Sequence, residues 1–280
     1  MSAVVPSPQE YVASLFGVTG KSVIVTGAAD GLGKAISSAF ARAGARVVLA
    51  DLDRDRLRAT TAELSAVSAA VVEKVTDVSD EGQVDAMVDF ATSCFGTIDI
   101  LVNNAGAMLG VVPPEAYPLS LWEATFAVNL TAPFLCSRAV SRVMIPGGGG
   151  SIINISSIGG ISALGGGILA YDVSKSGVIQ LTRELAVDWA KYGIRVNSIA
   201  PCQFRTRGWA AAMEDPAKAA FVDAVISGIP LGRMGEADEI VGAVLFLASG
   251  AASMVTGAVL PVDGGNLAAN PTLGGVLQGP

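Results

Sequence analysis

Three side chains have the types and spacing of an acid–base site. Tyr171 and Lys175 stand four positions apart in a stretch with helical periodicity, so both project from one helix face. A free tyrosine has a pKa of about 10, but a nearby ammonium favours the phenolate and lowers that pKa. Tyr171 can then take a proton from an alcohol or return it to a ketone oxygen. Ser157, which follows a predicted strand, can hydrogen-bond that oxygen.

A Tyr–Lys pair of this spacing is also typical of a helix surface, so the surrounding sequence decides between a surface pair and a catalytic pair. Residues 26–33 (TGAADGLG) join a short β-branched run to a helical stretch. Glycines let the backbone approach a pyrophosphate, and the helix N-terminus supplies free N–H groups and positive dipole. An ordinary tight turn can look the same. The position directly after the first strand favours a phosphate-binding loop.

Asp51 ends the second predicted strand, where an acidic residue can accept hydrogen bonds from an adenosine ribose. A 2′-phosphate would be repelled there, and the residue before Gly31 is Asp30 rather than a base. Both features favour NAD over NADP. The alternative is that Asp51 only caps the following helix, alone or with Asp53.

The rest of the sequence alternates short apolar strands with helices, which predicts parallel pairing and right-handed crossovers. The strands are apolar throughout, as expected when helices cover both faces of a sheet. We therefore predict one doubly wound, Rossmann-like α/β domain with a parallel seven-stranded sheet. The predicted parts are an N-terminal arm (1–20), a catalytic dinucleotide-binding domain (21–265) with a substrate loop near 203–230, and an irregular tail (266–280). Strands are predicted at 21–26, 45–50, 69–75, 99–102, 151–156, 194–200 and 258–262, and helices at 31–43, 54–64, 80–94, 120–143, 170–192, 208–226 and 236–249.

Over about residues 20–265, these motifs and their order resemble the short-chain dehydrogenase/reductase family. The shared motifs are the glycine loop, NNAG at 103–106, YxxxK at 171–175 and VDGG at 262–265. The resemblance implies hydride transfer between a nicotinamide and an alcohol or ketone carbon. The implied catalytic residues are Asn129, Ser157, Tyr171 and Lys175. In this resemblance Asn129 holds a water that links Lys175 to solvent, and Lys175 also binds the nicotinamide ribose. The implied cofactor contacts are Gly27, Asp30, Gly31, Leu32, Gly33, Asp51, Leu52, Asp77, Val78, Asn104, Ala105, Gly106, Tyr171, Lys175, Pro201, Phe204 and Thr206, the last of which matches the threonine that binds the nicotinamide carboxamide.

Two positions depart from the family pattern. Ser157 lies fourteen residues before the tyrosine rather than thirteen, which leaves Ser156 as an alternative catalytic serine. Cys202 follows Pro201 where a glycine is usual. Cysteine adopts a positive φ less readily than glycine, so a reshaped turn is expected. Cys202 is either a small packing residue or a reactive thiol.

Composition excludes several other classes of protein. The 280-residue chain has a net charge of −7 and no histidine, which rules out a Ser-His-Asp triad and a His-ligated metal site. An acidic chain is a poor partner for nucleic acid or an anionic membrane, and no run of about 18 apolar residues predicts a membrane span. Three widely spaced cysteines predict a reducing, cytoplasmic setting. A homodimer or homotetramer is implied by the resemblance alone.

The substrate is less determined than the chemistry. Predicted loops 107–118, 158–169 and 203–230 are rich in apolar side chains, which favours an apolar alcohol. Arg205 and Arg207 leave an acidic substrate open. Two other functions also remain: an NADP-dependent 3-oxoacyl-type reductase, against which Asp51 argues, and a catalytically silent dinucleotide-binding protein, against which the Ser–Tyr–Lys set argues.

Overall fold

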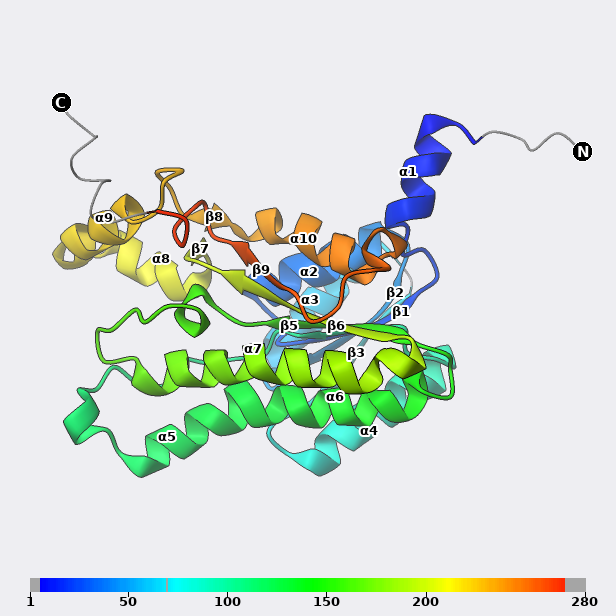
Figure 1. Ribbon diagram of the computed structural model, residues 1–280, viewed down its shortest axis with the longest axis horizontal. Coiled ribbons are helices and arrows are strands. Elements are labelled where there is room, and N and C mark those ends of the chain that lie inside the picture. The colour runs from blue at the N-terminus through cyan, green and yellow to red at the C-terminus, as the bar shows by residue number, and fades with distance from the viewer. Residues whose placement is uncertain (1–5, 69, 270–280) are drawn as a thin grey trace, which may run out of the picture.

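The computed structural model describes residues 6–68 and 70–269 and contains a parallel seven-stranded sheet (Figure 1). The strand order is β3-β2-β1-β4-β5-β6-β9, with β7 and β8 forming a separate two-stranded pair. The predicted fold class and strand number are confirmed. The strands are β1 (Ser22–Thr26), β2 (Arg46–Asp51), β3 (Val71–Val75), β4 (Ile100–Asn103), β5 (Gly150–Ile155), β6 (Ile194–Pro201), β7 (Phe204–Arg205), β8 (Gly235–Glu236) and β9 (Val259–Val262).

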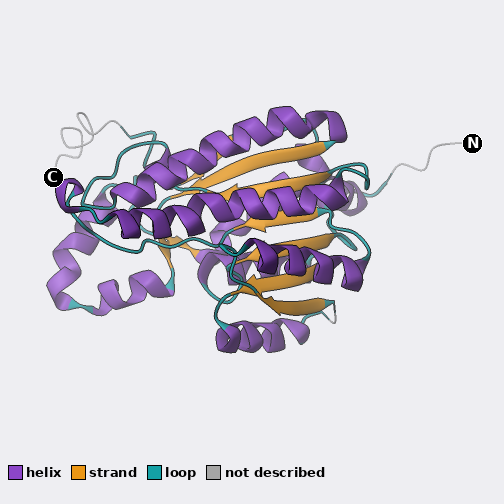
Figure 2. Ribbon diagram, turned by 90° about the horizontal axis from the view of Figure 1, so that it is seen from below, coloured by secondary structure: helices purple, strands orange, loops and turns teal. Residues whose placement is uncertain are grey.

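Helices cover both faces of the large sheet (Figures 1 and 2). Helices α2, α3 and α10 lie on one face, and α4, α6 and α7 lie on the other. The bounds are α1 (Pro8–Phe16), α2 (Gly31–Arg42), α3 (Arg54–Ser65), α4 (Glu81–Phe95), α5 (Leu119–Phe126), α6 (Ala132–Met144), α7 (Leu169–Trp189), α8 (Arg207–Glu214), α9 (Ala219–Ser227) and α10 (Val241–Ala248). Among the described residues, none of these helices is long and apolar enough to cross a membrane.

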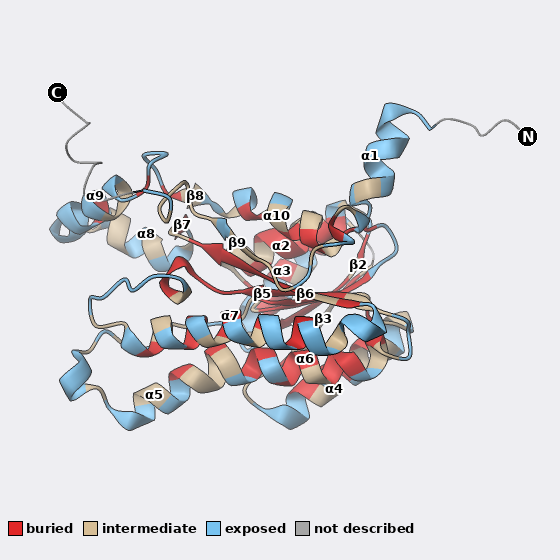
Figure 3. Ribbon diagram, viewed as in Figure 1, coloured by how far each residue is buried: buried red, intermediate tan, exposed pale blue. Residues whose placement is uncertain are grey.

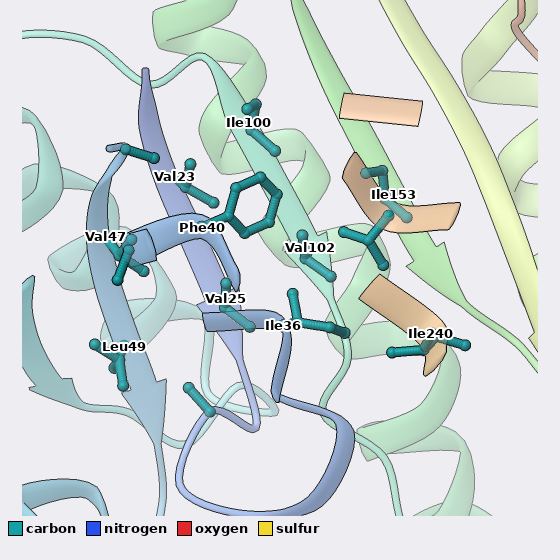
Figure 4. Packing of buried hydrophobic residues seen from close by; sticks show 14 of the residues in the cluster. Val23, Val25, Ile36, Phe40, Val47, Leu49, Ile100, Val102, Ile153 and Ile240 are labelled. Carbon is teal, nitrogen blue, oxygen red and sulfur yellow. The ribbon is translucent and has the colours of Figure 1, made fainter. Parts of the chain in front are cut away.

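The core consists of one apolar layer on each face of the sheet, as the burial colours in Figure 3 show. Successive strand residues point to opposite faces of the sheet, and helices cover both faces, so the residues on both faces must be apolar. In β1, Val23 and Val25 pack with Phe40 of α2 on one face, as Figure 4 shows, whereas Ile24 packs into the layer under α4 and α6. This alternation explains the continuously apolar strands of the sequence.

Two predicted helices are interrupted. The predicted helix 120–143 contains a π-helical turn, Ala127–Thr131, between α5 and α6. The predicted helix 208–226 is divided into α8 and α9 around Asp215 and Pro216. Proline has no N–H to donate and disfavours a helical residue before it, so the chain turns there. The Asp215 side chain then accepts the N–H of Ala217 to begin a new turn.

The described part of the predicted N-terminal arm contains α1, which starts at a capping box between Ser7 and Glu10. None of its residues is buried, and its main neighbour is the short turn Gly250–Ala252. Figure 1 shows α1 at the end of the molecule opposite α8 and α9. Residues 1–5, Ala69 and the predicted tail beyond residue 269 lie outside the described residues.

Candidate active site

The predicted site residues lie mainly at the carboxyl ends of the parallel strands. The chain leaves β1 for one side of the sheet and returns at β4 on the other, which makes the β1–β4 boundary a topological switch point. Parallel strands end at the same edge, so segments distant in sequence meet there. The phosphate loop follows β1, Asp51 ends β2, NNAG begins at the last residue of β4, Ser157 lies just beyond β5, and Thr206 follows the short β7 that comes after β6.

The phosphate loop needs glycine at defined positions. Gly27 has φ 64° and Gly31 has φ 53°, in the left-handed region. A Cβ on Gly27 would stand 2.9 Å from the Ala105 Cα, and one on Gly33 would stand 1.9 Å from the Gly27 carbonyl oxygen. At the start of α2, the backbone of Gly27 therefore passes close to Ala105, and that of Gly33 passes close to the Gly27 carbonyl. This bare loop before a helix N-terminus fits the diphosphate of a dinucleotide.

Asp51 holds this loop in place. One carboxylate oxygen accepts the Ala29 N–H at 3.0 Å, and the other accepts the Asp53 N–H at 3.0 Å. The cap of α3 is Asp53, whose side chain accepts the Arg56 N–H. Asp51 is thus tied to the phosphate loop and is not the capping residue of the following helix.

Thr26 joins the phosphate loop to the NNAG segment, a role that sequence inspection missed. Its hydroxyl accepts the N–H groups of Asn104 and Ala105, both at 3.1 Å. The Asn104 side-chain amide donates back to the carbonyls of Thr26 and Gly27 at 3.0 Å. Asn104 therefore orders two loops through its side chain. The signal in the sequence was a hydroxyl residue at the last position of β1.

Lys175 is buried between α7 and the sheet. Its Nζ donates to the Ile155 carbonyl at 2.9 Å and lies 5.7 Å from the centre of the Tyr171 ring. Burial lowers the pKa of Lys175 to about 8. A Cβ on Gly106 would stand 3.1 Å from this Nζ and 3.3 Å from the Asn129 Oδ1, so NNAG, α7 and the π-helical turn meet here.

The predicted lowering of the Tyr171 pKa is wrong for this structure. Burial of the side chain raises its pKa, a hydrogen bond from Ser157 opposes this in part, and the negative charge of Asp172 raises the pKa further. Desolvation disfavours the phenolate more than its neighbours stabilise it. Lys175, itself desolvated, does not reverse the balance.

The two candidate serines face different surroundings. The Ser156 hydroxyl donates to the Ile199 carbonyl at 2.9 Å and accepts from Ser198, so it lies within the sheet. The Ser157 hydroxyl accepts the Gly159 N–H at 3.1 Å and affects the pKa of Tyr171. The geometry thus favours Ser157 as the partner of Tyr171.

Asn129 lies in the π-helical turn with its side chain fully engaged. Its Oδ1 accepts the Ala107 N–H at 2.8 Å, and its Nδ2 donates to the Ala107 carbonyl and to the Ser174 hydroxyl. In the π turn, the Ala132 N–H bonds the Ala127 carbonyl five residues back. The side chain thereby fixes the backbone after NNAG against α7, next to Lys175.

The remaining predicted contacts differ in how their side chains are placed. Leu52 is 68% exposed, whereas Val78 and Phe204 are buried in the two apolar layers. The Phe204 ring also packs on Gly235, so contact with a cofactor would come from its backbone. Asp77 accepts the Ser79 N–H and hydroxyl. The structure thus brings these residues to one edge without making every side chain available.

Cys202 occupies its position without strain. Among the described residues, every positive φ belongs to a glycine, so Cys202 does not adopt the positive φ that a glycine could take at this position. Its N–H donates to the Val262 carbonyl, and partial burial raises the pKa of its thiol. A raised thiol pKa favours the packing role over the reactive one.

The substrate loops are tied to one another and to α7. The Val112 N–H donates to the Gly167 carbonyl at 2.9 Å, and the Leu164 N–H donates to Asp172 at 3.1 Å. Both arginines of the third loop are paired with carboxylates: Arg205 with Glu236 at 3.4 Å and Arg207 with Asp30 at 3.1 Å. Sequence inspection had not singled out Asp172, because its role depends on a loop that packs onto α7.

Comparison with known proteins agrees with this geometry. A sequence model described as enoyl-(acyl carrier protein) reductase matches residues 27–266. D-threitol dehydrogenase of Mycolicibacterium smegmatis is 41% identical over 250 residues, covering 89% of this chain and 94% of that protein. A short-chain type dehydrogenase/reductase from Mycobacterium marinum has a TM-score of 0.85 at 36% identity, covering 92% and 100% of the two chains.

A further neighbour bears on the cofactor. A structure from Beutenbergia cavernae, described as an NAD(P)-dependent gluconate 5-dehydrogenase with bound NADP at low occupancy, has a TM-score of 0.83 at 36% identity, covering 91% and 99%. Together with the site, these matches place the chain in the short-chain dehydrogenase/reductase family. It is an oxidoreductase of that family, whose members bind a nicotinamide dinucleotide.

Proposed function

We propose that this protein is an NAD(H)-dependent oxidoreductase that interconverts a secondary alcohol and a ketone. The observation that carries the proposal is the convergence of Ser157, Tyr171 and Lys175 beside a glycine-lined phosphate loop. When bound, the nicotinamide ring supplies the hydride acceptor or donor. The chain's own residues bind, orient and transfer the proton.

In the oxidative direction, the Tyr171 phenolate takes the proton from the alcohol oxygen while the carbon–hydrogen bond gives up its hydride. In the reductive direction, the phenol returns that proton to the carbonyl oxygen. Ser157 donates a hydrogen bond to the same oxygen and holds it near the phenol. Lys175, fixed on the Ile155 carbonyl with its Nζ 5.7 Å from the centre of the Tyr171 ring, would hold the nicotinamide ribose beside the phenol.

The charges around the phosphate loop support NAD over NADP. Asp51 lies against the loop through Ala29, and Asp30 adds a second carboxylate one residue further along. Lys34, the first cation within α2, is paired with Glu63 at 2.6 Å. A 2′-phosphate beside Asp51 would therefore meet the negative charge of that carboxylate, while Asp30 is paired with Arg207 and Lys34 with Glu63.

The paired arginines also bear on the substrate. Arg205 is paired with Glu236 and Arg207 lies against Asp30 of the phosphate loop, so neither cation of the third loop is directed at a substrate carboxylate. Apolar side chains such as Met108, Leu109 and Ile161 are exposed on the other two loops. We therefore propose an uncharged secondary alcohol, as in the D-threitol relative, rather than a sugar acid.

The test measures the formation of reduced nicotinamide by its absorbance. The substrates are a panel of neutral secondary alcohols and sugar acids, each assayed with NAD and with NADP. We expect a higher kcat/KM with NAD and with a neutral alcohol. Replacing Asp51 with Ala should weaken NAD binding and reduce the ratio of kcat/KM with NAD to kcat/KM with NADP. A lower dissociation constant for NADPH than for NADH would instead favour the NADP-dependent 3-oxoacyl-type reductase.

A further inference from the structure

Helices α8 and α9 form a separate layer beside the active site, at the left end of Figure 1. They pack mainly on each other, on the turn between them and, through α8, on β7. Within α8 no residue is buried, and within α9 only Val222 is. This layer, residues 207–227, is therefore held to the rest of the molecule by few contacts.

One side-chain interaction links the layer to the phosphate loop. The Arg207 Nε lies 3.1 Å from one carboxylate oxygen of Asp30. Among the described residues, this is the only ion pair or side-chain hydrogen bond that joins residues 207–227 to another part of the chain. Next to it, a Cβ on Gly31 would stand 3.4 Å from the Thr206 methyl group. The start of α8 thus rests on the phosphate loop.

The other Asp30 oxygen occupies part of the anion site itself. It accepts the Gly31 N–H at 2.7 Å, at the N-terminus of α2. A cofactor diphosphate bound there would lie beside a like charge, which opposes binding unless a cation compensates it. Arg207 is in contact with that charge, and its terminal nitrogens have no hydrogen-bond partner within the described residues.

The pair contributes little to folding, because both side chains are largely exposed: 59% for Arg207 and 45% for Asp30. A guanidinium can bind a carboxylate and a phosphate oxygen at once through different nitrogens. The same side chain can therefore cancel the Asp30 charge and contact the diphosphate.

We infer that Arg207 positions the cofactor by neutralising Asp30 and binding the diphosphate, and so links the cofactor to the start of α8. The inference rests on the proposed function and adds a residue that none of the family motifs supplies. ADP-ribose carries the diphosphate without the nicotinamide, so it isolates this contact from the chemistry.

The experiment measures ADP-ribose and adenosine binding by calorimetry for the intact protein and for R207Q. We expect R207Q to bind ADP-ribose about tenfold more weakly, the size of one charge-assisted contact, with little change for adenosine. R207K should recover part of the affinity. The matched control is R205Q, which breaks a similarly exposed ion pair two residues away and should bind like the unmodified protein.

Coupling to the helices is read by hydrogen exchange. ADP-ribose should slow exchange across residues 207–227 in the unmodified protein and in R205Q, but much less in R207Q. D30N should recover part of the ADP-ribose affinity in the R207Q background, because it removes the repulsion by Asp30 but does not replace the contact of Arg207 with the diphosphate. Equal affinity of R207Q and R205Q for ADP-ribose would overturn the inference while leaving the proposed function intact. Failure of the unmodified protein to bind ADP-ribose and NADH would overturn both.

Discussion

At the scale of single residues, the phenol hydroxyl of Tyr171 is the group most directly tied to the chemistry. Replacing Tyr171 with Phe removes the proton carrier and keeps the ring. We expect turnover to fall by about 10²–10⁴-fold, which is the usual contribution of general acid–base catalysis. The affinity for NADH should be nearly unchanged. Steady-state kinetics and NADH titration measure the two effects. Substantial remaining turnover would assign the proton transfer to another group.

Lys175 leads to a prediction about stability. Its pKa is lowered by burial from 10.5 to about 8, so the unfolded chain binds the proton more tightly than the folded protein. Below pH 8, the buried charge therefore destabilises the fold by about 3 kcal/mol, and this penalty disappears as pH rises from 8 to 10.5.

Replacing Lys175 with Met removes the charge and keeps most of the volume, but leaves the Ile155 carbonyl without its donor, at a cost of about 1 kcal/mol. We expect K175M to raise the free energy of unfolding by about 2 kcal/mol at pH 7. Urea unfolding at several pH values should show this difference shrinking above pH 8. A less stable K175M at pH 7 would contradict the pKa assignment.

The sequence predicted that Tyr171, Lys175 and Ser157 form one candidate site, because their spacing and their place after a strand were visible in one stretch of chain, and the structure brings the three side chains together. The predicted direction of the Tyr171 pKa was wrong, since burial depends on how segments distant in sequence pack around the side chain. Asp172 was missed for the same reason, because its partner Leu164 is brought to it only by the loop.

At the scale of elements, the turn after β5 places Gly159 against the Asp172 side chain. A Cβ on Gly159 would stand 2.2 Å from the Asp172 Oδ1, while the Gly159 N–H holds the Ser157 hydroxyl. Replacing Gly159 with Ala should displace Ser157 and lower kcat about a hundredfold, because small misplacements of catalytic groups are costly. It should also destabilise the fold by about 1–3 kcal/mol.

The control for Gly159 is a double variant. In G159A/D172A the closest contact is gone and only the Leu164 Cδ1, 3.1 Å from the Cβ position, must shift, so the free energy of unfolding should recover in part relative to G159A. Kinetics and urea unfolding of the three proteins measure this. Unchanged turnover in G159A alone would show that the turn does not position Ser157.

Element boundaries were predictable where a local signal marked them, and less so elsewhere. Gly193, with φ 74°, ends the helical segment after Tyr192 as its sequence position indicated. The π-helical turn could not be predicted, because Asn129 bonds to Ala107, a residue distant in sequence. Pro216 was a signal for a break in the sequence, but the apolar residues on both sides of it led to the prediction of one continuous helix.

At the scale of the whole molecule, the chain has no histidine, so Lys175, with a pKa of about 8, and Tyr171 set the dependence of rate on pH in the acid–base site. Oxidation needs the Tyr171 phenolate, and burial raises the pKa of that phenol. We expect kcat/KM for alcohol oxidation to rise into the alkaline range, and ketone reduction to be faster at lower pH. A profile that is flat, with hydride transfer shown by an isotope effect to limit the rate, would refute the role of Tyr171.

The strand order has a consequence for synthesis on the ribosome. β2 and then β3 are added outward on one side of β1, and β4, β5, β6 and β9 are added outward on the other. At no stage must a newly made strand enter between two strands that are already paired. The sheet can therefore grow at its free edges in the order in which the chain emerges, with β9, the last strand made, closing one edge.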